Sequence, residues 1–585
     1  SSDGSSEDYT NRVHYQSSNP EVATVTSQGL VSAVKPGETS LMVQAPGHST
    51  QVHVGVVAKP LPTQPELPLN NLIDKHVFRK LHKLHIIPSI LSTDEEFLRR
   101  VCLDLTGTLP PSGRVLDFLS SKDPQKRDKL ITMLLASPEY VDYWVFRFAD
   151  LFRLRGIGTT GGSRTFHWEW IRRNIATNRP YDEMIRERIS SQGYDRPSRF
   201  YLAGYKTRSL EKVVTEDVRV FMGRRLDCAQ CHDHPFDLWS QDQFWGLAAF
   251  YSQMTSTELR GDRVLFDDLN GEEVDFGTIP GALLTFKKAT NPRTKEEVPP
   301  MFLNGTVISE DMRHDPRLAL AHWMTSHPYF AEAIVNRMWS YFFGRGIVNP
   351  VDNFQWTNPP THPELLSDLA KDFRNRGHNL KHLIHRIVSS RTYQLSSAPN
   401  HTNKDDNINY SHALPRALDA EILLDAISTV TGVSIVFQDS QGAKAPPGTR
   451  AIQLREPASW PSHFLEIHGR PFRDSVPERD RKPNLSQALH RLVGSTYTQH
   501  LTQQGGRIDQ LIEAGVSDQQ VIKEIYLTAF SRFPTQQEQS GLEKLFRQQS
   551  SIAVHSSSVS NRIRREVIED FLWSLISARE FAYNH

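Results

Sequence analysis

The spacing of apolar residues along this chain changes at a proline-rich stretch. The spacing before the stretch and the spacing after it each restrict the secondary structure that the segment can form. Residues 8–57 alternate apolar and polar positions between turn signals, as in residues 21–25, 29–34 and 39–44. Such alternation is typical of short strands that bury one face. The sequence therefore predicts a small β-sandwich at the amino-terminal end.

Residues 59–68 hold four prolines, which favour an extended, semi-rigid connection between domains. From residue 71 onward apolar residues recur at helical spacing, first at positions 72, 73, 77, 81 and 84. We therefore expect the remainder of the chain to be mainly α-helical.

At 585 residues the chain exceeds what one core usually holds, which predicts three or four structural units. We expect the following order: a β module over 1–58, a linker over 59–70, a helical domain over 71–254, an irregular insertion over 255–305, and a second helical domain over 306–585. Within the insertion, residues 263–266 read as a short β-like piece.

The charges of the chain balance, with 67 lysines and arginines against 67 aspartates and glutamates. A balanced chain lacks the long-range positive field with which proteins hold nucleic acid or anionic membranes. The sequence has no run of about 18 apolar residues, and its first residues form neither a signal peptide nor a start methionine. We expect a soluble, processed chain with no transmembrane segment and no nucleic-acid partner.

Two of the three cysteines lie in one five-residue motif, Cys228-Ala-Gln-Cys231-His232. In a C-x-x-C-H motif two thiols add across the vinyl groups of a porphyrin, and the next histidine is placed to bind the iron. A helical segment over 216–226 leads into the motif and would hold the thiols in register. The motif predicts one covalently attached c-type haem, with His232 as the proximal ligand. Cys102, in an apolar run, is expected to be a core residue.

Three other interpretations of the motif stay open, and the first is a chance occurrence in a cysteine-poor chain. A redox-active disulfide of the thioredoxin kind would need a βαβ setting, which the surrounding sequence does not show. A zinc ion could use the two motif cysteines and two of three nearby side chains, although a structural zinc site usually takes its second ligand pair from a separate segment. These three side chains are His232, His234 and Asp237.

The second axial position of the iron has several candidates, and the sequence does not choose among them. They are Met222, Met254, His167 and His585. If that position stays open, His234, Asp237 or Arg337 could serve as a proton donor or charge stabiliser. Arg337 could instead clamp a haem propionate or a substrate anion, or form a structural ion pair with Asp352, Glu364 or another carboxylate.

The amino-terminal stretch resembles the bacterial Ig-like domain of group 2. The matching residues are 17–25, 29–31 and 36–39. We expect this module to be incomplete, because the usual first strand is missing before Tyr9. Such modules occur on secreted and surface proteins, and covalent haem attachment takes place outside the cytoplasm. Both imply a periplasmic, cell-surface or secreted location.

Longer motifs resemble those of the secreted planctomycete cytochrome c-linked proteins, in which two domains of unknown function occur in tandem. The first domain is matched by residues 72–74, 98–110, 134–140, 178–182 and 228–235, and the second by residues 333–339, 343–352, 358–366, 389–393, 532–535 and 580–581. The resemblance implies a place among secreted proteins that are encoded beside sulfatases and glycan-degrading enzymes. Residues 460–479 depart from it, because they lack the cysteine that relatives often carry before Glu478 and Arg479.

The motif and the resemblance together predict a secreted monohaem c-type protein that acts in a redox step of extracellular polysaccharide degradation, with a sulfated polysaccharide expected. We favour a haem-dependent oxidoreductase, because the accompanying fold is far larger than electron carriage requires. The alternatives are a pure electron-transfer cytochrome and a glycan-binding surface protein whose haem is structural or sensing. The expected partners are a redox protein or a small oxidant, and polysaccharide. We expect the haem in a cleft between the two helical domains.

Overall fold

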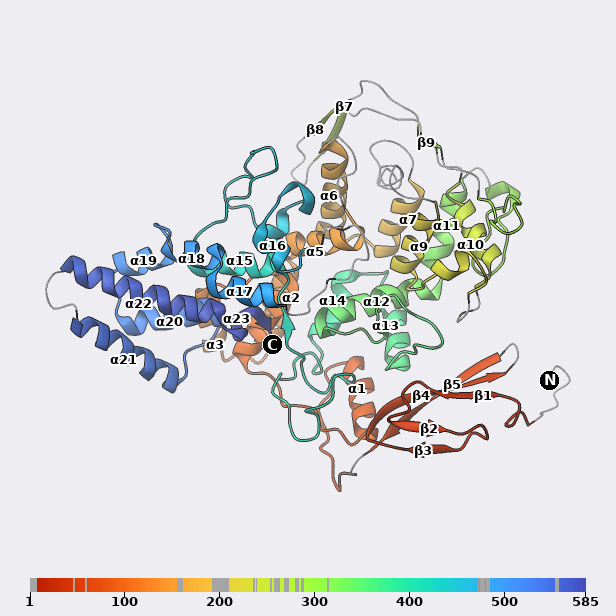
Figure 1. The fold of residues 1–585 in the computed structure, drawn as a ribbon, viewed down its shortest axis with the longest axis horizontal. Helices are drawn as coiled ribbons and strands as arrows, with labels where there is room; N and C mark the ends of the chain where they lie inside the picture. Colours follow the sequence, from red (N-terminus) through yellow and green to blue (C-terminus); the bar gives the residue numbers. More distant parts are fainter. Residues whose placement is uncertain are drawn as a thin grey trace.

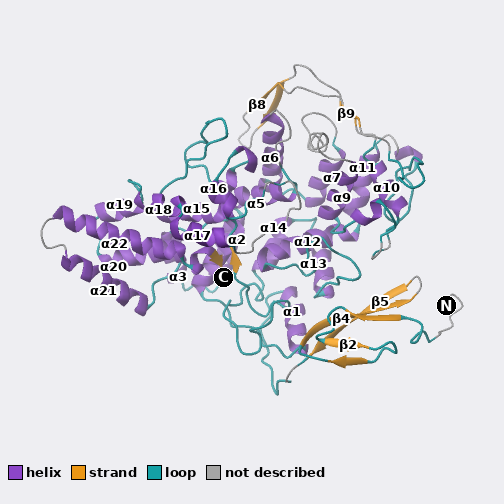
Figure 2. Cartoon of the chain, viewed as in Figure 1, coloured by secondary structure: helices purple, strands orange, loops and turns teal. Residues whose placement is uncertain are grey.

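The fold is described from a computed structural model, which is mainly α-helical with a small β module at the amino-terminal end (Figures 1 and 2). The structure describes residues 8–45, 48–57, 60–154, 161–191, 210–234, 237, 239–252, 255–256, 263–267, 273–278, 284–285, 289–312, 315–471, 473, 479, 484–552 and 557–585. The predicted fold class is confirmed at this level. Among the described helices, none has the length and hydropathy required to span a bilayer.

Two small antiparallel sheets form the amino-terminal module. β1 (His14–Ser17), β4 (Gly37–Ala45) and β5 (His48–Val56) pair in the order β1-β4-β5, while β2 (Ala23–Val25) pairs with β3 (Val31–Ala33). The β4–β5 register runs from Gly37 opposite Val56 to Ala45 opposite His48. Leu41 and Met42 are buried in the small core of this module. The alternation in the sequence thus predicted its β structure.

The proline-rich segment ends where the helices begin. Residues 60–70 form no helix or strand. The first helical segment contains α1 (Leu72–Lys83), α2 (Asp94–Thr106), α3 (Ser112–Ser120), α4 (Lys126–Leu135), α5 (Pro138–Leu151), α6 (Gly161–Ala176), α7 (Tyr181–Ser190), α9 (Leu210–Phe221), the short 3₁₀ turn η1 (Asp227–Gln230) and α10 (Gln241–Ala249). Asn71 caps α1 and Ser240 caps α10, each with a reciprocal capping box.

The insertion contains short strands. β6 (Thr255–Ser256) pairs with β9 (Leu284–Thr285), and β7 (Arg263–Asp267) pairs with β8 (Glu273–Thr278). The predicted β-like piece at residues 263–266 lies in β7.

The second helical segment covers the later half of the chain. It contains η2 (Glu310–Met312), α11 (Pro316–Ser326), α12 (Pro328–Phe343), α13 (Pro363–Asn375), α14 (Leu380–Val388), β10 (Arg416–Ala417), α15 (Ala420–Thr431), η3 (Ala451–Gln453), η4 (Pro457–Ser459), α16 (His463–Ile467), α17 (Leu485–Val493), α18 (Ser495–Thr502), α19 (Arg507–Glu513), α20 (Asp518–Phe530), α21 (Gln536–Ile552), α22 (Ser557–Ser577), α23 (Arg579–Ala582) and β11 (Tyr583–Asn584).

One hydrophobic core runs through both helical segments. Helix α1 packs on α13, α7 on α11 and α9 on α12. Polar contacts join the same segments. The buried carboxylate of Asp74 accepts hydrogen bonds from the backbone N–H and the hydroxyl of Thr392, both at 2.8 Å. Arg99 of α2 donates to the carbonyl oxygen of Ala529 at 2.7 Å. Residues at the start of the first helical segment are therefore bound by residues of the second.

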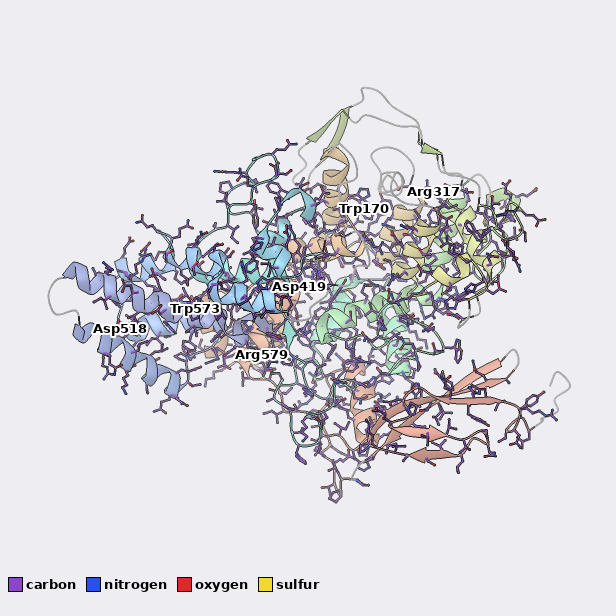
Figure 3. All side chains as sticks on the ribbon, viewed as in Figure 1. Trp170, Arg317, Asp419, Asp518, Trp573 and Arg579 are labelled. Carbon is purple, nitrogen blue, oxygen red and sulfur yellow. The ribbon has the colours of Figure 1, made fainter. Side chains whose placement is uncertain are left out.

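A cluster of buried ion pairs, here called the central ion-pair cluster, joins α5 to the later half of the chain. Its members are Arg147, Asp150, Asp419, Glu421, Arg473 and Arg479. Asp150 accepts from Arg473 at 2.8 Å and from Arg479 at 2.6 Å, and Arg479 also pairs with Glu421 at 2.6 Å. Figure 3 shows Asp419 near the middle of the molecule. Because every charge in the cluster is buried, each depends on its partners for stabilisation.

Candidate functional site

The C-x-x-C-H motif forms one tight turn at the surface. It begins in η1, which follows α9. The N–H groups of Cys231 and His232 both point to the carbonyl oxygen of Cys228, at 3.3 and 3.4 Å. Both thiols are free and exposed, and the imidazole of His232 is exposed as well. Within the described residues no group of three or more histidine, cysteine or acidic side chains is arranged to hold a metal ion.

The ring of His232 has a defined orientation. Its Nδ1 lies 2.7 Å from the carbonyl oxygen of Asp233. Because a carbonyl oxygen can only accept, Nδ1 carries a proton, and in the neutral form of the ring Nε2 is then the nitrogen with the lone pair. Histidines that bind metals commonly donate their other ring N–H to such a group, which fixes the tautomer. The ring of His232 is thus prepared to bind a metal through Nε2.

Helix α10 supports the buried side of the motif loop. The carbonyl oxygen of Gln230 accepts from the indole N–H of Trp245 at 3.1 Å and from the amide of Gln241 at 3.2 Å. The backbone N–H of Gln241 also donates to the carboxylate of Asp233 at 2.8 Å. These bonds hold the backbone of the loop from one side and leave the two thiols at the surface.

Residues from the second helical segment bind residues 219–225, which lead into the motif. Asp352 is fully buried and pairs with Arg219 and with Arg225, the latter at 2.7 Å. Burial would raise the pKa of Asp352, but hydrogen bonds from Arg225 and Arg219 hold it below its usual range. The N–H of Phe354 donates to the carbonyl oxygen of Gly223 at 2.9 Å. The motif is thus positioned by residues that follow it by more than a hundred positions.

Gly223 provides a test of this contact. Its φ is +68°, and a Cβ atom there would lie 2.7 Å from Cδ2 of Phe354. Gly377 has a similar φ of +63° but open space around it. We expect Gly377→Ala to lower the free energy of unfolding by about 1 kcal/mol through backbone strain. Gly223→Ala should cost roughly 1 to 3 kcal/mol more through the clash with Phe354. Thermal unfolding of both variants measures the difference, and equal losses would contradict the contact.

A cleft of about 400 Å³ lies beside the motif. Arg224 precedes the motif and Asp237 follows it, and both line the cleft. The other lining residues are Gln51, Tyr329, Glu332, Phe354, Gln355, Trp356, Asn358, Pro359, Pro360, Pro363, Leu366 and Ser367. The guanidinium of Arg224 lies 3.8 Å from the ring centroid of Tyr329. The cleft therefore joins the β module, the motif segment and the second helical segment.

Glu332 is a cleft residue that the sequence analysis missed. It is a half-buried acid on α12, and among the described residues its carboxylate has no hydrogen bond and no ion pair. Burial raises the pKa of Glu332, against the opposing charges of Arg224 and Arg374. A carboxyl group with a raised pKa in a cleft is typical of acid–base sites. The signal in the sequence was a single acid within the apolar stretch 328–335.

The raised pKa of Glu332 predicts a pH-dependent effect of removing its charge. The pKa of this carboxyl is higher in the folded protein than in the unfolded chain, where it is near 4.5. The folded state therefore loses stability as the pH rises through the range between these two pKa values. Glu332→Gln should therefore stabilise the protein at pH 7, by roughly 0.5 to 2 kcal/mol, and should have little effect at pH 3. Thermal unfolding at the two pH values measures this. A variant that is less stable than the parent at pH 7 would contradict it.

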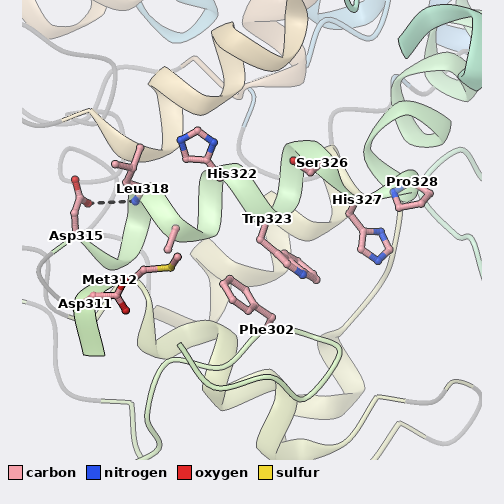
Figure 4. A pocket seen from close by; sticks show the side chains of 11 residues that line it. Phe302, Asp311, Met312, Asp315, Leu318, His322, Trp323, Ser326, His327 and Pro328 are labelled. Atoms are coloured by element: carbon pink, nitrogen blue, oxygen red, sulfur yellow. Dashed lines mark hydrogen bonds between the residues drawn. The ribbon is translucent and has the colours of Figure 1, made fainter. Parts of the chain in front are cut away.

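A second pocket, of about 700 Å³ and mostly apolar, lies along α11 (Figure 4). In it the ring of Phe302 stacks on Trp323 with centroids 5.2 Å apart, and Trp323 lies 5.2 Å from His327. His327 in turn lies 4.3 Å from Tyr329, which lines the cleft. Burial and the charge of Arg224 lower the pKa of His327, so its ring is neutral at pH 7. A chain of rings thus connects the pocket with the cleft.

The candidate distal ligands that the structure describes have separate surroundings. In the described part of the chain, the one polar contact of the His232 ring is with Asp233. Met222 is enclosed in the core and His167 is buried on α6. His585 packs on α2, where Arg100 donates to its carbonyl oxygen, and its Nε2 lies 3.3 Å from the carbonyl oxygen of Glu580. Met254 lies outside the described residues.

The three candidates for proton donor or charge stabiliser have different surroundings. Asp237 lines the cleft. His234 is half-buried, and its N–H donates to the carbonyl oxygen of Trp239 at 2.8 Å. Arg337 is buried on α12 near Tyr181 and does not line the cleft.

The two carboxylates named as ion-pair partners for Arg337 bind other arginines. Asp352 pairs with Arg219 and Arg225, and Glu364 pairs with Arg79. Both oxygens of Asp352 are bound by the two arginines of α9 and the following turn. A structural ion pair of Arg337 with a carboxylate stays a prediction.

Family models match three parts of the chain. Residues 2–54 match the bacterial Ig-like domain (group 2), residues 72–256 match a protein of unknown function (DUF1549), and residues 316–546 match a protein of unknown function (DUF1553). The expected tandem of two domains of unknown function behind an Ig-like module is confirmed. No curated protein and no solved structure matches the chain.

Proposed function

We propose that this chain, with its Ig-like module and tandem domains, is a secreted monohaem c-type protein whose haem is attached through Cys228 and Cys231. His232 is the proximal ligand. The observation that carries the proposal is the hydrogen bond from His232 Nδ1 to Asp233, which leaves Nε2 free beside two exposed thiols. This donor set suits a c-type haem, in which two thioethers and one imidazole come from one turn.

The bound haem would supply one-electron redox chemistry, with a potential set by its ligands and its burial. The protein's own residues supply the rest. Gln241 and Trp245 hydrogen-bond the backbone of the motif loop, and Asp352 pairs with Arg225, which precedes the loop. Glu332 and Asp237 offer carboxyl groups in the adjoining cleft, where a proton can be held or released.

We further propose that the protein acts in a redox step of extracellular polysaccharide degradation, with a sulfated polysaccharide expected, as a haem-dependent oxidoreductase. The cleft beside the motif supports catalysis, because an electron carrier needs no cleft lined by two carboxyl groups, one of them, Glu332, with a raised pKa. The match to a bacterial Ig-like domain supports a location outside the cytoplasm.

Electron transfer without catalysis is the second candidate function. The chain of rings from Tyr329 through His327 to Trp323 favours it, because these neighbouring rings, tilted against one another, lead from the cleft toward a second pocket. The partner would then be a redox protein or a small oxidant.

The attachment is tested on protein exported from cells that mature c-type haem. Acid–acetone extraction should leave the colour with the protein, and mass spectrometry should show about one haem per chain. A colourless protein with stoichiometric zinc would contradict the proposal. A high-spin ferric spectrum that changes with cyanide supports an oxidoreductase, whereas a low-spin spectrum indifferent to cyanide supports electron transfer.

A further inference from the structure

We propose that the cleft beside the motif binds a neutral sugar ring of a polysaccharide, stacked on Trp356 and hydrogen-bonded by Glu332, Gln355 and Gln51. The inference rests on the proposed function for the reaction that follows, whereas the binding is argued from the cleft alone.

Trp356 provides an aromatic surface on which none of the described residues places a ring. It is half-buried in the cleft, and among the described residues it makes no ring contact and its indole N–H makes no hydrogen bond. A tryptophan joins a large apolar face to one polar N–H, and inside proteins both usually find partners. A pyranose ring has an apolar C–H face and a rim of hydroxyl groups, so it can satisfy both.

Three side chains around Trp356 have hydrogen-bonding groups without a protein partner. In the described part of the chain, Glu332 and the side-chain amide of Gln355 make no hydrogen bond, and Oε1 of Gln51 is buried without a partner. A buried polar atom left unpaired destabilises the folded state, and a protein rarely retains one without a reason. Hydroxyl groups both donate and accept, so a sugar can pair with all three side chains.

The charges of the cleft favour a neutral ring. Glu332 and Asp237 line it, whereas Arg224 is the arginine among the lining residues and lies over the ring of Tyr329. A sulfate group on the bound ring would face both carboxylates. Sulfate groups elsewhere on the same polysaccharide chain are compatible with this site.

Native gels that contain a polysaccharide test the binding with full-length holoprotein. The probes are laminarin, xylan and agarose as neutral chains, and chondroitin sulfate as a sulfated chain. We expect at least one neutral chain to slow the protein. Trp356→Ala should weaken that binding about tenfold or more, and Glu332→Gln about three- to tenfold. Trp573→Ala is the matched control, because Trp573 is also half-buried but lies on α22 (Figure 3).

Two outcomes would overturn the inference. One is slowing by chondroitin sulfate alone, or by none of the four chains. The other is an equal effect of Trp356→Ala and Trp573→Ala. The haem content of each sample separates this result from the proposed function. A coloured protein that binds none of the chains overturns the sugar site alone, whereas a colourless protein that binds a neutral chain overturns the haem proposal alone.

Discussion

Replacing Cys228 and Cys231 together by serine is expected to leave no covalently attached haem. Each thioether needs a thiol, and serine hydroxyls do not add to the vinyl groups under the same conditions. Both thiols are exposed and free, so the substitution removes no protein contact that supports the fold. Mass spectrometry and a haem stain after a denaturing gel measure the loss. Single replacements should leave one linkage and a less stable attachment.

Cys102 provides the control for this experiment. It is buried on α2, and burial raises the pKa of its thiol to about 12, so no thiolate forms at neutral pH. Cys102→Ala should therefore keep the full haem content while losing about 1 kcal/mol of stability. Haem retained by the double serine variant, or lost from Cys102→Ala, would contradict the assignment of the motif.

Asp150→Asn is expected to cost about 3 to 5 kcal/mol, because it leaves two buried arginines without their shared carboxylate. Arg473 and Arg479 both donate to Asp150, and all three side chains are less than 10% exposed. Burial would raise the pKa of Asp150, but the charges of Arg479 and Arg473 hold it below its usual range. The contribution is therefore present above the unfolded pKa and is lost as the pH falls. Calorimetric unfolding at pH 7 measures the cost.

Asp123→Asn is the matched control. Asp123 also pairs with a cation, Lys129, but the two side chains are 34% and 66% exposed. Exposed pairs contribute about 0 to 1 kcal/mol, so this variant should unfold close to the parent. Similar losses in the two variants would show that the central ion-pair cluster adds nothing beyond ordinary surface charge.

The broad architecture could be predicted from the sequence because local patterns determine it. Alternation over residues 8–57 predicted the β module, and helical spacing from residue 71 onward predicted the helices. The continuity of the core could not be predicted in this way. Contacts such as Asp74 with Thr392 join residues 318 positions apart, and no local period indicates them.

The candidate site could likewise be predicted only where its residues lie close together in the sequence. Cys228, Cys231 and His232 could be identified because one turn contains them all, and their spacing has a chemical meaning. The cleft could not, because Gln51, Glu332 and Trp356 come from distant segments that the fold brings together. Arg337 illustrates the opposite error. An arginine on an apolar helix suggested a site, yet Arg337 is buried and does not line the cleft, whereas Arg224 does.

The dependence of the motif on Asp352 has a consequence for how the protein matures. Asp352 follows Arg225 by 127 residues, so a chain that crosses a membrane in order presents both cysteines before their ion-pair anchor has emerged. During that interval α9 and the motif lack the later wall of the cleft, and the proposed attachment of haem to the two thiols could already take place. Arrival of Asp352 and Phe354 then completes the wall. If haem is attached as proposed, attachment could thus precede the pairing of Asp352 with Arg219 and Arg225, in the order in which the chain is synthesised.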